Sequence, residues 1–220
     1  MERHSFLSLL ATSLIAASPP PISQSGQLLR STADPNIVLQ IADGFVPLPP
    51  VTLSLESTDV DRRIFIDASA THTIRRLIVL QFERVRHGGS FRFVYPAKPP
   101  FSFGGTTYRV GTYVYDDARD SAAAPNRESG VTRAALLRQG YVLPRLLRTA
   151  RLARVANSAG TSEIIMFYEE NADADYPAGP LTGADEDGDL VLRGVEARAL
   201  LERMSAVISV SPASGSPHPG

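Results

Sequence analysis

The sequence contains no cysteine among its 220 residues. This excludes disulfides, thiolate metal sites and thiol nucleophiles, and it also excludes the cysteine through which a lipoprotein is attached to its lipid. A chain of this length buries roughly 70% of its unfolded surface on folding, so it needs no covalent cross-links for stability.

Excess charge of one sign and long apolar runs are also missing. The chain has 22 basic and 23 acidic residues, a formal net charge of −1, and Lys98 is its only lysine. This balance excludes a general attraction to nucleic acid or anionic lipid. No stretch after residue 25 approaches ~18 consecutive apolar residues, so we expect a soluble mature chain without a transmembrane segment.

A short apolar segment lies near the N-terminus. Residues 6–17 are almost entirely apolar, they follow the polar head Glu2-Arg3-His4, and Pro19–Pro21 and small residues come after them. This order predicts a signal peptide at residues 1–25, removed after Ser25, and therefore a periplasmic or secreted protein. The alternatives are an uncleaved apolar N-terminus and a start site further along the chain.

The remaining chain divides by composition. We expect a flexible lead-in at residues 26–36, a single α+β domain at residues 37–208 and a disordered tail at residues 209–220. The tail contains almost nothing that could be buried in a core.

The first half of the domain reads as β-sheet. Alternating or β-branched segments predict strands at residues 51–56, 64–66, 74–86 and 106–115, although residues 74–86 also fit a helical face. Glycines at 88 and 89 predict a turn and a return strand at residues 91–95, followed by a loop at residues 98–105.

The second half reads as mainly helical. We predict helices that begin at Asn126 or Ser129 and end near Gln139, at residues 144–156, and at residues 196–207. The apolar run at residues 163–168 predicts a central strand buried on both faces. The fold class is therefore α+β, with an antiparallel or mixed sheet and two or three helices packed on one side.

Catalytic groups are few. His87 falls at the predicted turn, so His72 is the remaining histidine within the domain that could act as a base, together with Asp67 and with Asp116 or Asp117. The Gly-x-Ser-x-Gly pattern of a strained nucleophile turn is absent. We therefore expect no catalytic site, and we keep His72, Asp67 and Asp116 as weak candidates.

One acidic turn resembles a calcium loop in part. Asp185, Asp187 and Asp189 surround Gly188, but glycines occupy the positions where the first and twelfth ligands of such a loop belong. We interpret this segment as a solvated turn, and we expect neither a metal ion nor another cofactor.

Arginines recur every third residue at Arg145, Arg148, Arg151 and Arg154, while residues 169–189 contain eight acids and no base. On the predicted helix the arginines form a broad basic flank. We interpret both segments as solvated surfaces that neutralise each other. The alternative is a docking face centred on Arg148 and Arg151.

Aromatic residues concentrate between residues 91 and 115. Tyrosine offers a large contact area at low entropic cost, so several tyrosines on one sheet face could bind a ligand or a partner. The candidates for this role are Tyr95, Phe101, Tyr108, Tyr113 and Tyr115.

The scarcity of catalytic groups favours a non-enzymatic binding or accessory module of the cell envelope. Its expected partner is an envelope protein or a small apolar ligand. The alternatives are an exported hydrolase whose site contains His72 and nearby carboxylates, and an envelope-assembly factor that docks through its arginine flank.

Overall fold

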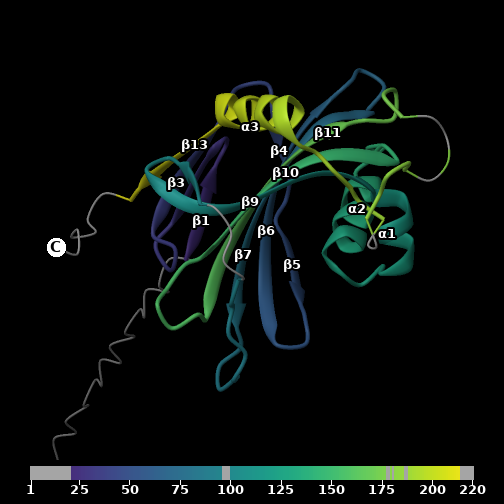
Figure 1. The fold of residues 1–220 in the computed structure, drawn as a ribbon. Coiled ribbons are helices and arrows are strands. Elements are labelled where there is room, and N and C mark those ends of the chain that lie inside the picture. The colour runs from purple at the N-terminus through teal and green to yellow at the C-terminus, as the bar shows by residue number, and fades with distance from the viewer. Residues whose placement is uncertain (1–20, 96–99, 177–178, 180, 186–187, 214–220) are drawn as a thin grey trace, which may run out of the picture.

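The computed structural model describes residues 21–95, 100–176, 179, 181–185 and 188–213. These residues form mostly antiparallel β-sheet together with three helices (Figure 1). None of the helices in these ranges is long and apolar enough to cross a membrane.

The larger sheet has nine strands. These strands are β4 (Val46–Pro47), β5 (Val51–Ser54), β6 (Thr58–Ala68), β7 (Ile74–Val85), β8 (Phe101–Phe103), β9 (Thr106–Asp116), β10 (Leu146–Val155), β11 (Ser162–Asn171) and β12 (Leu190–Val191). The order across the sheet is β12-β9-β10-β11-β7-β6-β4, with β5 also paired to β6 and β8 to β9. The strands predicted at residues 51–56, 64–66, 74–86, 106–115 and 163–168 are confirmed.

A smaller sheet joins the two ends of the described chain. Its strands are β1 (Ile22–Ser25), β2 (Leu28–Ser31), β3 (Ile37–Ile41) and β13 (Ile208–Pro212), in that order. We expected a flexible lead-in where β2 lies and a disordered tail where β13 lies. Both segments are ordered because they pair with β3, and because Leu29 of β2 and Ile208 of β13 are buried in the core.

The three helices are α1 (Asp117–Ala123), α2 (Glu128–Arg138) and α3 (Gly194–Val207). The second and third confirm two of the predicted helices. The helix predicted at residues 144–156 is wrong, because this segment forms β10. Leucine, alanine and arginine favour helix locally, but β10 pairs along its length with β9 and β11, and these contacts override the local preference.

The return strand predicted at residues 91–95 is also wrong. Both edges of β7 are already occupied, by β6 and β11, so residues 91–95 find no free edge beside it. This segment has no regular secondary structure.

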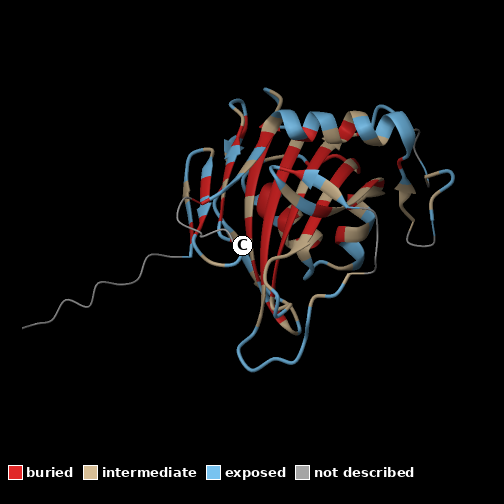
Figure 2. Ribbon diagram, turned by 60° about the vertical axis from the view of Figure 1, so that its left-hand side comes forward, coloured by how far each residue is buried: buried red, intermediate tan, exposed pale blue. Residues whose placement is uncertain are grey.

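The helices lie on both faces of the larger sheet, so the expected packing on one side is not confirmed. Leu200 and Met204 of α3 pack in one apolar cluster with alternate residues of β7, β10 and β11, whereas Leu136 of α2 packs in a second cluster with Leu77 and Val79. Figure 2 shows that the central strands are buried along most of their length. The sheet therefore has an α3 face and an opposite face, which α1 and α2 cover in part.

Candidate functional site

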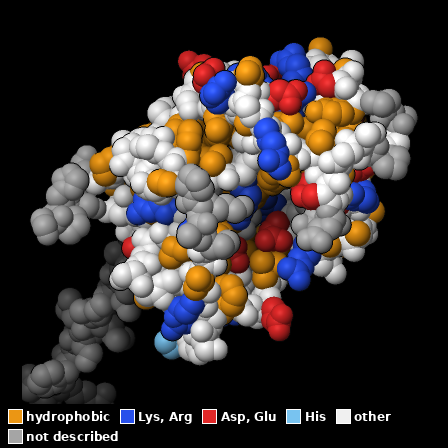
Figure 3. All heavy atoms as spheres, viewed as in Figure 1, with side chains coloured by type: hydrophobic (Ala, Val, Ile, Leu, Met, Phe, Trp, Pro, Cys, Tyr) orange, Lys and Arg blue, Asp and Glu red, His pale blue; other side chains and the backbone are white. Residues whose placement is uncertain are grey.

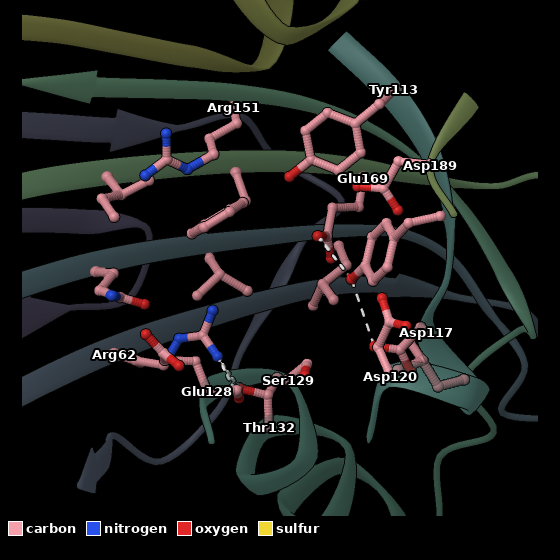
Figure 4. A pocket seen from close by; sticks show the side chains of 17 residues that line it. Arg62, Tyr113, Asp117, Asp120, Glu128, Ser129, Thr132, Arg151, Glu169 and Asp189 are labelled. Atoms are coloured by element: carbon pink, nitrogen blue, oxygen red, sulfur yellow. Dashed lines mark hydrogen bonds between the residues drawn. The ribbon is translucent and has the colours of Figure 1, made fainter. Parts of the chain in front are cut away.

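A cavity of about 300 Å³ lies between the larger sheet and the helices α1 and α2 (Figure 4). We call this cavity the inner pocket. Its lining combines apolar residues with charged and aromatic side chains that include Arg62, Gln81, Tyr113, Tyr115, Asp117, Phe167 and Glu169.

Strand alternation places these side chains on one face. On β11, Ile164, Met166 and Tyr168 belong to the apolar cluster under α3, so the residues between them point the other way. Phe167 and Glu169 accordingly line the inner pocket. The pocket thus lies on the opposite face of the sheet from the apolar core under α3, and its lining is more polar than that core.

Glu169 and Asp117 are linked by the hydroxyl of Tyr115. This hydroxyl lies 3.2 Å from Oε1 of Glu169 and 3.4 Å from Oδ1 of Asp117, and Figure 4 shows both contacts as dashed lines. Burial, reinforced by the charge of Asp117, raises the pKa of Glu169 to about 7. Glu169 can therefore exchange a proton near neutral pH.

Asp117 begins α1 and is itself buried. Burial raises its pKa, while hydrogen bonding and charge from Arg133 on α2 oppose that rise. The neighbouring Asp116 caps the same helix by accepting a hydrogen bond from the backbone N–H of Arg119 at 3.0 Å, and it pairs with Arg145 at 2.8 Å. Asp117 thus faces the pocket, whereas Asp116 has a structural role.

Arg62 on β6 is a buried cation, with 5% of its surface exposed. Its Nη1 donates to the hydroxyl of Thr132 and to the backbone carbonyl of Glu128, both on α2. Its Nε is buried without a hydrogen-bond partner, and no carboxylate of the described chain forms a salt bridge with it. A buried cation with an unpaired N–H lowers the stability of the fold.

Gln81 stands opposite Arg62 in the register of β6 and β7. Its Nε2 donates to Oε2 of Glu83 at 3.0 Å, and Thr58 donates to the other oxygen of the same carboxylate. The Oε1 atom of Gln81 is buried and has no partner.

A second polar cluster lies further along β11. Glu163 accepts a hydrogen bond from the hydroxyl of Tyr95, and burial raises the pKa of this carboxyl to about 7. Glu163 and Tyr95 line a groove of about 530 Å³, which shares Arg151 and Ile165 with the inner pocket. Since Glu163 and Glu169 are six residues apart on one face, the two clusters are about 20 Å apart along the strand.

Phe167 lies between these clusters with two guanidinium groups close to its ring. The Cζ atoms of Arg62 and Arg151 are 5.7 Å and 5.9 Å from the ring centroid, within the range of a cation–π interaction. On the sheet face opposite α3, the middle of β11 therefore lies among basic and aromatic groups, while the groups at both ends are acidic.

The aromatic candidates separate onto the two faces. Tyr113 and Tyr115 line the inner pocket with ring centroids 5.9 Å apart, and Tyr95 lines the adjoining groove. Tyr108 is buried in the cluster under α3, and Phe101 packs against that cluster. The structure thus brings three of the five candidates to the sheet face that carries the inner pocket.

The arginine candidates separate in the same way. An odd spacing of three places successive arginines on opposite faces of a strand, so the basic flank expected of a helix does not form. Arg151 lines the pocket, while Arg148 on the other face pairs with Asp175 at 2.9 Å and with Glu170 at 3.7 Å. In Figure 3, acidic and basic side chains are interspersed over the visible surface.

The structure does not bring His72 together with the candidate carboxylates. His72 is exposed, has a backbone φ of 61° and stacks on Tyr141 with centroids 5.4 Å apart. Asp67 is held by Arg75 and Arg76, and Asp116 is held as described above.

The acidic turn is closed by its own backbone. The N–H of Asp189 donates to Oδ1 of Asp185 at 3.0 Å, and the N–H of Asp185 donates to the carbonyl of Asp189 at 2.8 Å. Asp187 lies outside the described residues. Among the described residues, no group of three His, Asp or Glu side chains is arranged to hold a metal ion.

Sequence reasoning missed Arg62, Gln81, Glu163 and Glu169. In the sequence, the two glutamates are distinguished only by their position: they flank the apolar run at residues 164–168 and lie an even number of residues apart, on one face of the strand. Their burial on a central strand marks them as candidates for function. No family model, curated protein or solved structure matches this chain.

Proposed function

We propose that the chain is an exported, non-enzymatic binding module whose inner pocket takes a small polar molecule. One observation carries this proposal: Arg62 and Gln81 line the pocket with 5% and 1% of their surfaces exposed, and each has a polar atom without a partner. Buried polar atoms of this kind lower stability unless something binds to them.

The polarity of the pocket changes the expected ligand. We expected an envelope protein or a small apolar ligand, but an apolar ligand would leave Nε of Arg62 and Oε1 of Gln81 without hydrogen bonds. Charged and hydroxyl-bearing side chains also line much of the cavity. A hydrogen-bonding ligand satisfies these groups, which favours a polar molecule.

The experiment compares two adjacent arginines of β6 in the ligand-free protein. At pH 5.5, where Glu169 is protonated, Arg62→Met is expected to raise the melting temperature by a few degrees because it removes a buried, incompletely paired charge. Arg63 is the matched control, since it points to the other side of the strand and bonds Asp61 at 2.7 Å.

Arg63→Met is expected to leave the melting temperature unchanged or slightly lower. If Arg62→Met lowers the melting temperature by more than Arg63→Met does, Arg62 is a structural residue and the proposal loses its main support.

A second candidate function is hydrolysis, with Glu169 as the general acid in place of His72. The carboxyl pair Glu169 and Asp117, linked through Tyr115, favours this candidate, because a group with a pKa of about 7 is suited to proton transfer at neutral pH. The Glu169→Gln variant separates the two functions. It abolishes turnover by a hydrolase, whereas a binding module retains its ligand.

Export rests on the signal peptide predicted at the N-terminus, and it implies a periplasmic or secreted location. Cleavage after Ser25 would remove β1 and with it Ile22, which is 6% exposed in the apolar core. We therefore place the cleavage site before Ile22. Intact-mass measurement of the protein from its native host tests this, and an uncut chain would contradict export.

A further inference from the structure

The wall of the inner pocket contains a buried donor and a buried acceptor, each without a hydrogen-bond partner. Arg62 and Gln81 are register partners on neighbouring strands, and both line the pocket. The Nε–H of Arg62 lacks an acceptor and Oε1 of Gln81 lacks a donor. A ligand that satisfies both must accept one hydrogen bond and donate another.

Side chains of both charges line the same pocket. The pocket contains the guanidinium groups of Arg62 and Arg151, and Figure 4 shows Glu128 near Arg62 and the other carboxyl groups, those of Asp117, Asp120, Glu169 and Asp189, toward the other end of the pocket. A phosphate or carboxylate would be drawn to the arginines but repelled by the acids, and an amine would meet the opposite conflict. A hydroxyl group avoids both conflicts, because it accepts from a guanidinium, donates to a carboxylate and carries no charge.

Aromatic rings complete the lining. Phe167, Tyr113 and Tyr115 all contribute to the pocket. A ring that carries hydroxyl groups at its edge and C–H groups on its faces can contact aromatic side chains while its edge bonds to the polar groups. The cavity of about 300 Å³ lies at the lower end of the usual range for ligand pockets, which suits one such ring.

We infer that the inner pocket binds a saccharide, with Arg62 and Gln81 bonding neighbouring hydroxyl groups. This inference rests on the proposed binding function and specifies its ligand class. The groove lined by Tyr95 and Glu163 shares Arg151 with the pocket, so further sugar units can extend along β11 in that direction.

The test is isothermal titration calorimetry of the full chain at pH 7. The probes are D-glucose, D-galactose, N-acetyl-D-glucosamine and their β-1,4-linked disaccharides, with inorganic phosphate and benzamidine as charged comparisons. At least one saccharide is expected to bind with a Kd of about 1 mM or below. Arg62→Met and Gln81→Leu are expected to weaken this binding by about tenfold or more, because each leaves a ligand hydroxyl unpaired. Arg63→Met, the matched control, is expected to leave it unchanged.

Each outcome decides a different claim. A wild-type protein that binds no saccharide, or saccharide binding that survives both pocket substitutions, overturns the saccharide assignment. Phosphate or benzamidine binding that depends on Arg62 also overturns it, but it leaves the proposed pocket intact. If no probe binds and Arg62→Met destabilises the ligand-free protein, the proposed function fails as well. Near-ultraviolet circular dichroism verifies the fold of each variant, and Arg62→Met alone decides the test if Gln81→Leu does not fold.

Discussion

The two faces of the larger sheet are built from the same strands but from different chemistry. On β11, the face toward α3 carries Ile164, Met166 and Tyr168 in a continuous apolar cluster. The face toward α1 and α2 carries Glu163 and Glu169, both buried and both with a pKa raised to about 7. One face therefore stabilises the fold, and the other contains groups that lower stability.

This difference in chemistry is informative because the side chains of β11 are buried to a similar extent on the two faces. Buried apolar side chains stabilise a protein, whereas incompletely paired buried carboxyls and guanidiniums lower stability, and groups of this kind cluster at functional sites. The contrast between the faces thus marks the inner pocket as the candidate site.

The largest expected effect is a difference in stability loss between alanine substitutions at two adjacent isoleucines of β11. Ile164→Ala is expected to lower the free energy of unfolding by about 3–4 kcal/mol, because it opens a cavity in the α3 core. Ile165 already borders the inner pocket, so Ile165→Ala is expected to cost less than half as much. Urea unfolding measures both, and equal losses would show that the two faces are packed alike.

The next effect depends on pH. The pKa of Glu169 is raised from 4.5 to about 7 in the folded state, so the folded chain binds more protons than the unfolded chain between these values, and stability falls as pH rises. Glu169→Gln removes this loss. We expect the variant to match the wild type at pH 4 and to exceed it by about 2–3 kcal/mol at pH 8.

Glu170→Gln is the matched control from the opposite face. Although burial raises its pKa, hydrogen bonds from Arg203 and Tyr168 lower the pKa of Glu170 overall, so its charged form stabilises the fold above pH 4.5. This variant is expected to lose stability at pH 8 and to approach the wild type as the pH falls below 4.5. Urea unfolding at several pH values measures both variants, and shifts of the same sign would contradict the assignment of the two faces.

The smallest expected effect concerns the hydroxyl of Tyr115. Tyr115→Phe removes a hydrogen bond to the charged form of Glu169, so it is expected to raise the pKa of Glu169 further while changing stability by about 1 kcal/mol or less. Carbon-detected NMR titration of the glutamate carboxyl measures this shift. Tyr113→Phe, from the same strand face, is the control and should leave the pKa unchanged.

Apolar patterning, β-branched content and helix capping were enough to predict β7, β9 and β11, as well as α2 and α3. They failed for β10, because a segment rich in leucine, alanine and arginine has no local preference for strand. Its conformation is set by β9 and β11 on either side, and this information lies elsewhere in the chain.

The site was predicted only in part for a related reason. Tyr113, Tyr115, Arg151 and Asp117 were singled out by residue type, but Arg62 looks like an ordinary polar residue of a half-exposed strand. Its burial depends on α2, which covers β6 from more than 60 residues away in the sequence. Only the folded chain shows that this guanidinium is enclosed.

The pairing of β13 with β3 has a practical consequence for anyone who shortens the chain. A protein that ends at residue 207 would leave the backbone amides and carbonyls along one side of β3 uncovered. An unpaired sheet edge can pair with strands of other molecules. The shortened protein is therefore expected to self-associate through its smaller sheet, although the pocket on the larger sheet is unchanged.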